Sequence, residues 1–304
     1  MMHSLPTLPL EPWEKTKKTL HLYFQVVGKI ALKLNPSRNH WWHITLHVTA
    51  TGLTTASMPM DDSGRLFEIN FDFIQHQLQV RTCDGDNRGF DLKDGLSVAS
   101  FKKQLFGILD ELKVKVKIVD KPYDLEPEKS FDQIEEFHFY NKESVEKYWA
   151  VLRWVDKVFI EFSAGFYGKQ CPVHLYWHHM DLAVTRFSGK KGPEMDPSAK
   201  ASDKDAYSHE VISFGFWAGD DIVREPAFYS YTYPSPKGID EEPLAPDYAS
   251  WVDSNGSPMA FLSYNLLQKE ANPNDVLLSF LNSAYQAGAK RAGWDIASFT
   301  YKPF

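Results

Sequence analysis

Residues 67–82 read FEINFDFIQHQLQVRT, and the spacing of apolar side chains in this stretch decides the fold class. Phenylalanine or isoleucine stands at every second position from Phe67 to Phe73, with charged or amide side chains between them. A period of two is typical of a half-buried β-strand. The polar residues 75–77 then lead into a second alternation over 78–82. The stretch therefore predicts an antiparallel β-hairpin.

Helices are predicted on both sides of this hairpin. Pro12 suits a first helical turn, and apolar residues at helical spacing follow it as far as Gly28. After the hairpin, Ser97 is a suitable N-cap for a helix whose apolar face ends at Leu112. Further alternation predicts strands over 42–49 and 114–119.

The chain after residue 142 repeats this order of elements. An apolar helical stripe begins at Val145 and ends near Gly165. A final helix opens at Asn272-Pro273 and keeps an apolar face as far as Gly288. Between the two helices, strands are predicted over 173–186, 210–217 and 227–233, with a hairpin around Asn255-Gly256.

A residue-level echo accompanies the repeated order. The string W-x-H-x-x-L-x-V-T occurs at 41–49 and again at 177–185, an offset of 136. We interpret the echo as an internal duplication, with two unrelated α+β units as the alternative. The predicted fold is α+β, in two related halves that each run helix–strands–helix, with mostly antiparallel sheets packed by helices. The predicted boundaries are 1–125 for the first half, 126–142 for a surface linker and 143–304 for the second half.

Composition favours a globular protein and argues against a nucleic-acid partner. Of the 304 residues, 43% are hydrophobic and 24% are charged, which is ordinary globular usage. The 33 basic residues are outnumbered by 40 acidic ones, for a net charge of −7. No basic block stands out, so contact with a phosphate backbone is not expected.

Cysteine usage and hydropathy predict a cytoplasmic protein that is not inserted in a membrane. Only Cys83 and Cys171 occur, too few for a disulfide framework. The start of the chain has no basic region followed by an apolar run, so no secretory signal is expected. No stretch stays apolar for the roughly 20 residues that a spanning helix needs. Residues 188–206 are small, polar and charged, and predict a mobile loop, either a lid or an insertion without a role.

Eleven histidines raise the question of a metal site. On the predicted strand, His43 and His47 lie roughly 13 Å apart at about 3.3 Å per residue, too far to share one ion. Adjacent residues on a strand point to opposite faces, which separates His178 from His179. A metal would have to be held across strands, for example by His179 and Asp181 with His209 or Glu210. No metal ligand is assigned.

The segment Tyr207-Ser208-His209-Glu210 supplies a hydroxyl, an imidazole and a carboxylate, the groups used in nucleophilic and acid–base catalysis. Neighbours on a strand face opposite ways, so Ser208 and His209 are not expected to pair. We favour a structural role for His209, hydrogen-bonded to a neighbouring strand.

Aromatic residues make up 14% of the chain and gather in the second half. Tyr229, Tyr231 and Tyr233 share one strand face by alternation. Such a face is suited to a flat or hydroxylated small molecule, because phenols offer both contact area and hydrogen bonds. The alternative is an aromatic core between sheet and helices. Arg186 is either an anion anchor in a cavity or an ion-paired residue of the sheet.

Several strings resemble those of a bacterial family of uncharacterised proteins. They are NHWWH at 39–43, GLTT at 52–55, PVH at 172–174, TRFSG at 185–189, YSHE at 207–210 and PAFY at 226–229. The resemblance covers nearly the whole chain. That family is a domain of unknown function, so the resemblance implies a cytoplasmic setting but names no substrate.

The candidate site combines residues from separate strands of the second half. The candidate catalytic residues are His209, Glu210, His179 and Asp181. The candidate ligand-binding residues are His174, Arg186, Tyr207, Trp217, Tyr229 and Tyr231. The first hypothesis is binding of a small polar or aromatic ligand in a pocket there. A hydrolase-like enzyme, with or without a metal, and a non-catalytic interaction scaffold are the alternatives. Sequence leaves open the cofactor, the oligomeric state and whether the protein is an enzyme.

Overall fold

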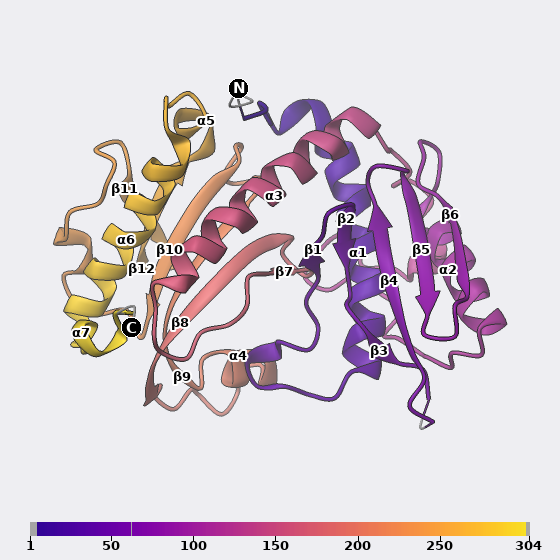
Figure 1. The fold of residues 1–304 in the computed structure, drawn as a ribbon, viewed down its shortest axis with the longest axis horizontal. Helices are drawn as coiled ribbons and strands as arrows, with labels where there is room; N and C mark the ends of the chain where they lie inside the picture. Colours follow the sequence, from indigo (N-terminus) through magenta and orange to yellow (C-terminus); the bar gives the residue numbers. More distant parts are fainter. Residues whose placement is uncertain (1–4, 62, 302–304) are drawn as a thin grey trace.

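The computed structural model describes residues 5–61 and 63–301. The chain forms two antiparallel β-sheets with helices packed on them, and Figure 1 shows the two sheets side by side. Each half of the chain supplies one sheet, in the order helix, strands, helix. The predicted α+β fold with two halves is confirmed. The outer ends of the predicted halves, residues 1–4 and 302–304, lie outside the described residues.

The first half contains the predicted hairpin as strands β4 and β5. Phe71 pairs with Leu78 in antiparallel register, and both side chains are buried. Ser97 caps the following helix, because its side chain accepts a hydrogen bond from the backbone N–H of Ser100. The elements are η1 (Glu11–Trp13), α1 (Glu14–Leu34), η2 (Asn39–Trp41), β1 (His47–Val48), β2 (Gly52–Thr54), β3 (Met58–Pro59), β4 (Leu66–Asp72), β5 (Gln77–Thr82), β6 (Asn87–Asp91), α2 (Val98–Glu111) and η3 (Phe131–Gln133).

The second half begins with the long helix α3, and α6 is its last long helix, as predicted. Asn255 and Gly256 form the turn of the last hairpin, both with left-handed φ. The elements are α3 (Lys142–Ala164), β7 (His174–Tyr176), β8 (Asp181–Lys191), α4 (Ala201–Ala206), β9 (His209–Trp217), β10 (Ala227–Tyr233), η4 (Ile239–Glu241), β11 (Ser250–Ser254), β12 (Ser257–Ser263), α5 (Tyr264–Leu267), α6 (Pro273–Arg291) and α7 (Ile296–Phe299).

The two sheets meet at their edge strands. The first has the order β1-β2-β4-β5-β6 with β3 added on β4, and the second has the order β11-β12-β10-β9-β8-β7. Leu46, next to β1, and Leu175 in β7 exchange two backbone hydrogen bonds of 2.9 and 2.7 Å. One cluster of buried apolar residues runs through both halves. The halves therefore share a core instead of folding around separate ones.

Helix α1 ties the first half to the second. At Gly28 a β-carbon would lie 2.2 Å from the indole ring of Trp177, so the glycine lets this ring pack directly on the helix backbone. Gly28 thus lies inside α1, which continues to Leu34 and does not end at the glycine as predicted.

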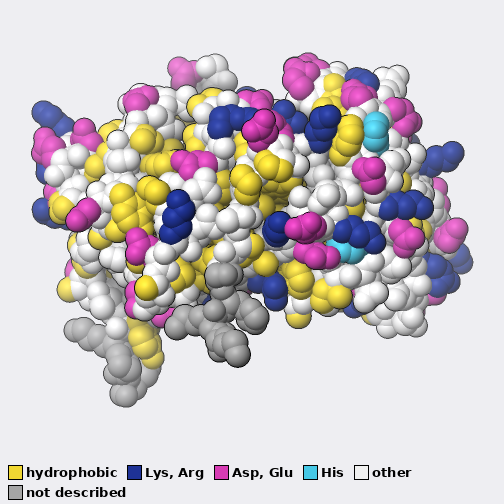
Figure 2. All heavy atoms as spheres, turned by 90° about the horizontal axis from the view of Figure 1, so that it is seen from above, with side chains coloured by type: hydrophobic (Ala, Val, Ile, Leu, Met, Phe, Trp, Pro, Cys, Tyr) yellow, Lys and Arg dark blue, Asp and Glu magenta, His cyan; other side chains and the backbone are white. Residues whose placement is uncertain are grey.

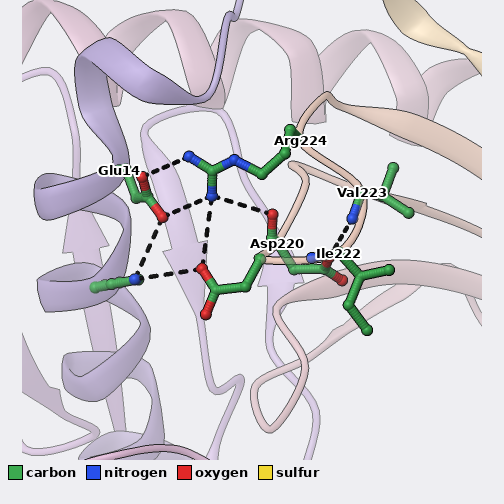
Figure 3. A network of polar contacts seen from close by, with 7 residues as sticks. Glu14, Asp220, Ile222, Val223 and Arg224 are labelled. Atoms are coloured by element: carbon green, nitrogen blue, oxygen red, sulfur yellow. Dashed lines mark hydrogen bonds and ion pairs between the residues drawn. The ribbon is translucent and has the colours of Figure 1, made fainter.

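A surface network joins the same helix to the loop between β9 and β10 (Figure 3). Arg224 donates two hydrogen bonds of 2.9 and 2.8 Å to the carboxylate of Glu14. Lys18 lies 3.3 Å from Glu14 and 3.5 Å from Asp221. The hydrogen bond from Arg224 lowers the pKa of Glu14 to about 2. The network holds the loop against α1.

Two predicted strands are interrupted. Of residues 42–49, only His47 and Val48 form a strand, because Asn39–Trp41 make a 3₁₀ turn in which His40 and Trp41 have left-handed φ. The predicted strand over 173–186 is split by a turn at 177–180, so it becomes β7 and β8. Neither turn carries the glycine or proline that would have marked it in the sequence.

Three further segments also differ from prediction. Residues 114–119 alternate in burial but form no strand, since the structure pairs them with no other strand in the described ranges. The linker 126–142 was expected at the surface, yet three of its side chains are buried, those of Phe131, Ile134 and Tyr140. The segment 188–206 contains the end of β8 and the short helix α4. Apolar residues within a polar stretch explain the buried linker positions.

The surface mixes both signs of charge. Figure 2 shows acidic and basic side chains interspersed on the upper face of the molecule, with apolar side chains between them. Among the helices of the described ranges, none has both the length and the apolar character needed to cross a membrane.

Candidate functional site

The second sheet has two chemically different faces. Residues paired across antiparallel strands point to the same side, so Arg186, Ile212 and Thr232 share one face. This face packs on α3, as the 4.8 Å ring contact between Phe162 and Phe214 shows, and on α6, where the Arg186 guanidinium lies 4.5 Å from the Tyr285 ring. The opposite face contains the rows Ala183–Gly215–Tyr229 and Thr185–Ser213–Tyr231. We call it the Asp181 face, formed by His174, Asp181, Ala183, Thr185, His209, Ser213, Gly215, Trp217, Tyr229 and Tyr231.

Asp181 and Tyr229 form the central contact of the Asp181 face. The Tyr229 hydroxyl donates a 2.7 Å hydrogen bond to Oδ2 of Asp181. Asp181 is only 9% exposed, and its Oδ1 has no hydrogen-bond partner in the described part of the chain. Burial raises the pKa of Asp181, and the hydrogen bond from Tyr229 opposes this only in part. Burial also raises the pKa of Tyr229 well above its usual value, so the phenol keeps its proton.

The small residue Gly215 makes this contact possible. A β-carbon at Gly215 would lie 2.3 Å from the Tyr229 ring. The ring therefore lies flat across β9, between its own strand β10 and the carboxylate at the start of β8. The Ala183–Gly215 row gives the Asp181 face a floor of small side chains.

Further phenols adjoin this contact. The rings of Tyr229 and Tyr231 are stacked with centroids 6.1 Å apart, and Trp217 lies 5.6 Å from Tyr229. The hydroxyls of Tyr207 and Tyr231 lie 3.4 Å apart, which is long for a hydrogen bond between oxygens. All four aromatic side chains are half-buried. Each hydroxyl keeps donor or acceptor capacity for another molecule.

His174 belongs to the same face, but its side chain is buried and cannot reach a ligand in solvent. Its side chain is 1% exposed, and its ring lies 4.7 Å from that of Tyr176 and 6.3 Å from that of His47. Burial lowers the pKa of His174 to about 3, so the imidazole is neutral at physiological pH. It contributes packing to the edge of the face.

Three predicted residues lie away from this face. Arg186 is buried among the helices, donates a 2.6 Å hydrogen bond to the Phe162 carbonyl and lies 3.5 Å above the Phe162 ring. Glu210 points to the helix side of β9 and accepts a 2.7 Å hydrogen bond from Ser188. His179 is exposed in the β7–β8 turn, 3.8 Å from Asp124. The ten predicted residues therefore do not form one cluster.

Ser208 and His209 are hydrogen-bonded, contrary to prediction. The Ser208 hydroxyl lies 3.1 Å from Nδ1 of His209, because Ser208 is in the turn before β9 and strand alternation does not apply to it. Within the described residues, no carboxylate forms a hydrogen bond with His209, so the third member of a catalytic triad is not in place.

Comparison with protein families places this chain. Residues 5–301 match the model of a family of unknown function, DUF5996. The chain belongs to the DUF5996 family. The resemblance to a family of unknown function is thus confirmed, and the family supplies no activity. No curated protein and no solved structure matches the chain.

The described residues of this DUF5996 chain contain no set of side chains arranged to bind a metal ion. Among residues 5–61 and 63–301, no three histidine, cysteine, aspartate or glutamate side chains lie close enough together to hold an ion. The proposed set of His179 and Asp181 with His209 or Glu210 is divided among a turn and two faces of the sheet.

Two surface hollows lie outside the predicted site. One, of about 450 Å³, lies between α3 and the β4–β5 turn, and Glu146, Trp149 and Arg153 contribute to its lining. The other, of about 610 Å³, lies on α2. Neither contains a predicted site residue, so the Asp181 face is a half-open surface and not one of these hollows.

Sequence reasoning missed His40 as a functional candidate. Its imidazole is 4% exposed and lies 2.8 Å from the amine of Lys169. The string NHWWH carried the resemblance, but nothing in it revealed the left-handed backbone at His40 and Trp41. His76 was missed too; its ring joins the Tyr140 hydroxyl to the Glu146 carboxylate, each at 3.1 Å.

Proposed function

We propose that the Asp181 face binds a small, flat molecule that carries O–H or N–H donors. The observation that carries the proposal is the Asp181–Tyr229 hydrogen bond, made by a buried carboxyl group and a half-buried phenol on the sheet face opposite α3 and α6. The proposal retains the predicted ligand-binding roles of Tyr207, Trp217, Tyr229 and Tyr231.

The chemistry of the bound molecule follows from the hydrogen bonds already made. Tyr229 uses its proton on Asp181, so its oxygen is left as an acceptor. A donor from the ligand would extend the chain to Asp181, and such chains strengthen one another in a poorly hydrated site. Tyr207 and Tyr231 hold each other only weakly, which leaves both available. The stacked Tyr229 and Tyr231 rings favour a flat partner.

A ligand site accounts for these residues better than a protein-docking scaffold does. The aromatic rings on the Asp181 face are half-buried, and the largely exposed apolar side chains of the described chain are scattered over other elements, such as Ile74, Ile160 and Ile222. A docking surface is expected to expose contiguous apolar area.

Binding of two probes tests the proposal. Catechol offers hydroxyl donors and benzamidine offers N–H donors on a flat ring, and ligand-observed NMR gives their affinities. We expect saturable binding of at least one probe, weakened up to about tenfold by Asp181→Asn or Tyr229→Phe, because a hydrogen bond to a neutral group contributes roughly 0.5–1.5 kcal/mol.

A matched control comes from a second tyrosine–carboxylate pair. The Tyr248 hydroxyl donates a 3.0 Å hydrogen bond to Glu270 on an exposed surface. Tyr248→Phe removes a similar bond away from the Asp181 face and should leave probe affinity unchanged. Failure of both probes to saturate, or equal affinities in all variants, would exclude the proposal.

A further inference from the structure

Lys169 lies in an unusual setting for a lysine near the surface. Its amine is 2.8 Å from Nε2 of His40, 4.5 Å above the Phe187 ring and 5.5 Å from the Trp42 ring. Its backbone is held in place because the Phe187 N–H donates a 3.0 Å hydrogen bond to the Lys169 carbonyl. The side chain is exposed enough for a small reagent to reach the amine.

The partners of His40 decide its tautomer. Nδ1 lies 3.3 Å from the carbonyl oxygen of Ala206, which can only accept, so Nδ1 carries the hydrogen. Nε2 then has a lone pair, and this lone pair points at the Lys169 amine. Burial lowers the pKa of His40, which keeps the imidazole neutral. The pair therefore joins an amine to a base.

The backbone around His40 is strained. His40 and Trp41 have φ of 56° and 62°, a region that costs a side-chain-bearing residue on the order of 1 kcal/mol or more. The segment is held by two hydrogen bonds, from the Trp41 indole N–H to the Ser202 carbonyl at 2.9 Å and from the Tyr176 hydroxyl to the His40 carbonyl at 3.3 Å. Strain that is maintained by outside contacts is common at functional sites.

Among the described residues, Lys169 has no carboxylate counter-ion beside it, and burial makes its charged form less favourable. Over the described ranges, no carboxylate lies within ion-pair distance of Lys169. Burial lowers the pKa of Lys169, and Asp205 opposes this in part from a greater distance. The nearest other titratable ring is that of His209, 5.5 Å from His40. A lysine with a neighbouring base and no counter-ion is the arrangement that nucleophilic amines use.

We propose that Lys169 is a nucleophilic amine, with His40 as its base, that condenses with small aldehydes. The amine nitrogen attacks the carbonyl carbon and forms a C–N bond, and His40 takes the proton that the nitrogen loses. His40 returns that proton to the oxygen, which gives the neutral carbinolamine. It then takes the second proton from the nitrogen and delivers it to the hydroxyl, so that the C–O bond breaks, water leaves and an imine forms. This activity goes beyond ligand binding at the Asp181 face and does not depend on it.

Reductive trapping tests the amine directly. The full chain is treated with glyoxylate and sodium cyanoborohydride at pH 7, and peptide mass spectrometry follows carboxymethylation of each lysine. Lys157 is the internal control, since it is exposed on α3 and makes no hydrogen bond or ion pair with the described residues. We expect Lys169 to be labelled about tenfold faster, and its rate to rise at lower pH than that of Lys157.

The variant His40→Asn distinguishes the effect of the imidazole base from that of the left-handed backbone. Asparagine tolerates left-handed φ better than most residues, so the turn should persist while the imidazole is lost. We expect the excess rate at Lys169 to vanish while Lys157 keeps its rate, and an unchanged urea midpoint shows that the variant stays folded. Equal rates for both lysines in the unaltered protein, or an excess that survives in H40N, would overturn the proposal.

Discussion

The Tyr229 hydroxyl reaches the Asp181 carboxylate across an intervening strand, at 2.7 Å, because Gly215 leaves room for the ring between them. Asp181 is at the start of β8 and Tyr229 is in β10, so β9 separates the two residues. A carboxylate, a phenol and a glycine from three strands thus form one unit. The unit links the stability of the sheet to the chemistry of its exposed face.

Gly215→Ala should disrupt that unit. The new β-carbon would overlap the Tyr229 ring at 2.3 Å, so the ring must move off the strand and away from Asp181. We expect a loss of about 1–3 kcal/mol in the free energy of unfolding, measured by urea denaturation. Binding of catechol or benzamidine should weaken in parallel. Unchanged stability would show that the ring does not rest on this glycine.

Asp181→Asn should change how stability depends on pH. The pKa of Asp181 is raised in the folded state above its ordinary 3.8, so from pH 3.8 upward the folded chain holds more protons than the unfolded one. The contribution of Asp181 to stability is complete below that pH and is lost as pH rises through the raised pKa. Asparagine does not titrate and has no such loss. The free energy of unfolding of D181N, relative to that of the unaltered protein, should therefore rise between pH 4 and pH 8.

Tyr229→Phe is the companion to that measurement. It removes the hydrogen bond that lowers the Asp181 pKa, so the loss of stability should continue to higher pH than in the unaltered protein. Urea denaturation at a series of pH values gives both differences. A D181N advantage that shrinks as pH rises would contradict the assigned direction.

Gly28→Ala and Gly107→Ala should have opposite effects, although both glycines lie in helices. At Gly28 the added methyl would meet Trp177 at 2.2 Å, and we expect a loss of roughly 1–3 kcal/mol. At Gly107 it would meet nothing within 4 Å, so the better helix propensity of alanine should add up to about 1 kcal/mol. Thermal unfolding of the two variants checks the difference in sign.

Arg186→Met should leave the Asp181 face unaffected. The Arg186 guanidinium lies among the Phe162, Phe166 and Tyr285 rings on the other side of the sheet, where burial lowers its pKa to about 9. Methionine fills similar space and should change stability by less than about 1.5 kcal/mol. Arg186→Ala, which leaves a cavity, should cost about 2–5 kcal/mol. Weaker binding of catechol or benzamidine to Arg186→Met would contradict this prediction and indicate that Arg186 contacts the ligand.

Local signals were enough to predict most of the elements. The alternation in residues 67–82 became the β4–β5 hairpin, and the Ser97 cap opens α2 at the predicted residue. Strand alternation also placed Asp181 and Arg186 on opposite faces. The period of side chains along a strand or helix is a property of the local backbone, so the sequence reveals it directly. The internal duplication stays a hypothesis, because only the order of elements and one short string of residues recur.

The turns and the site depended on contacts between distant segments. His40 and Trp41 adopt left-handed φ because residues from α4 and β7 hold them, and no local signal marks such positions. The Lys169–His40 pair joins residues 129 positions apart.

The sequence by itself determined the α+β class, the four long helices, and the face on which residues of the confirmed strands lie. Only the tertiary structure decided which faces of the sheets are covered by helices. Arg186 is therefore buried in the core, whereas Tyr229 is half-buried. The physical reason is that periodicity depends on neighbours in the chain, whereas burial and hydrogen bonding depend on which helix packs against which sheet.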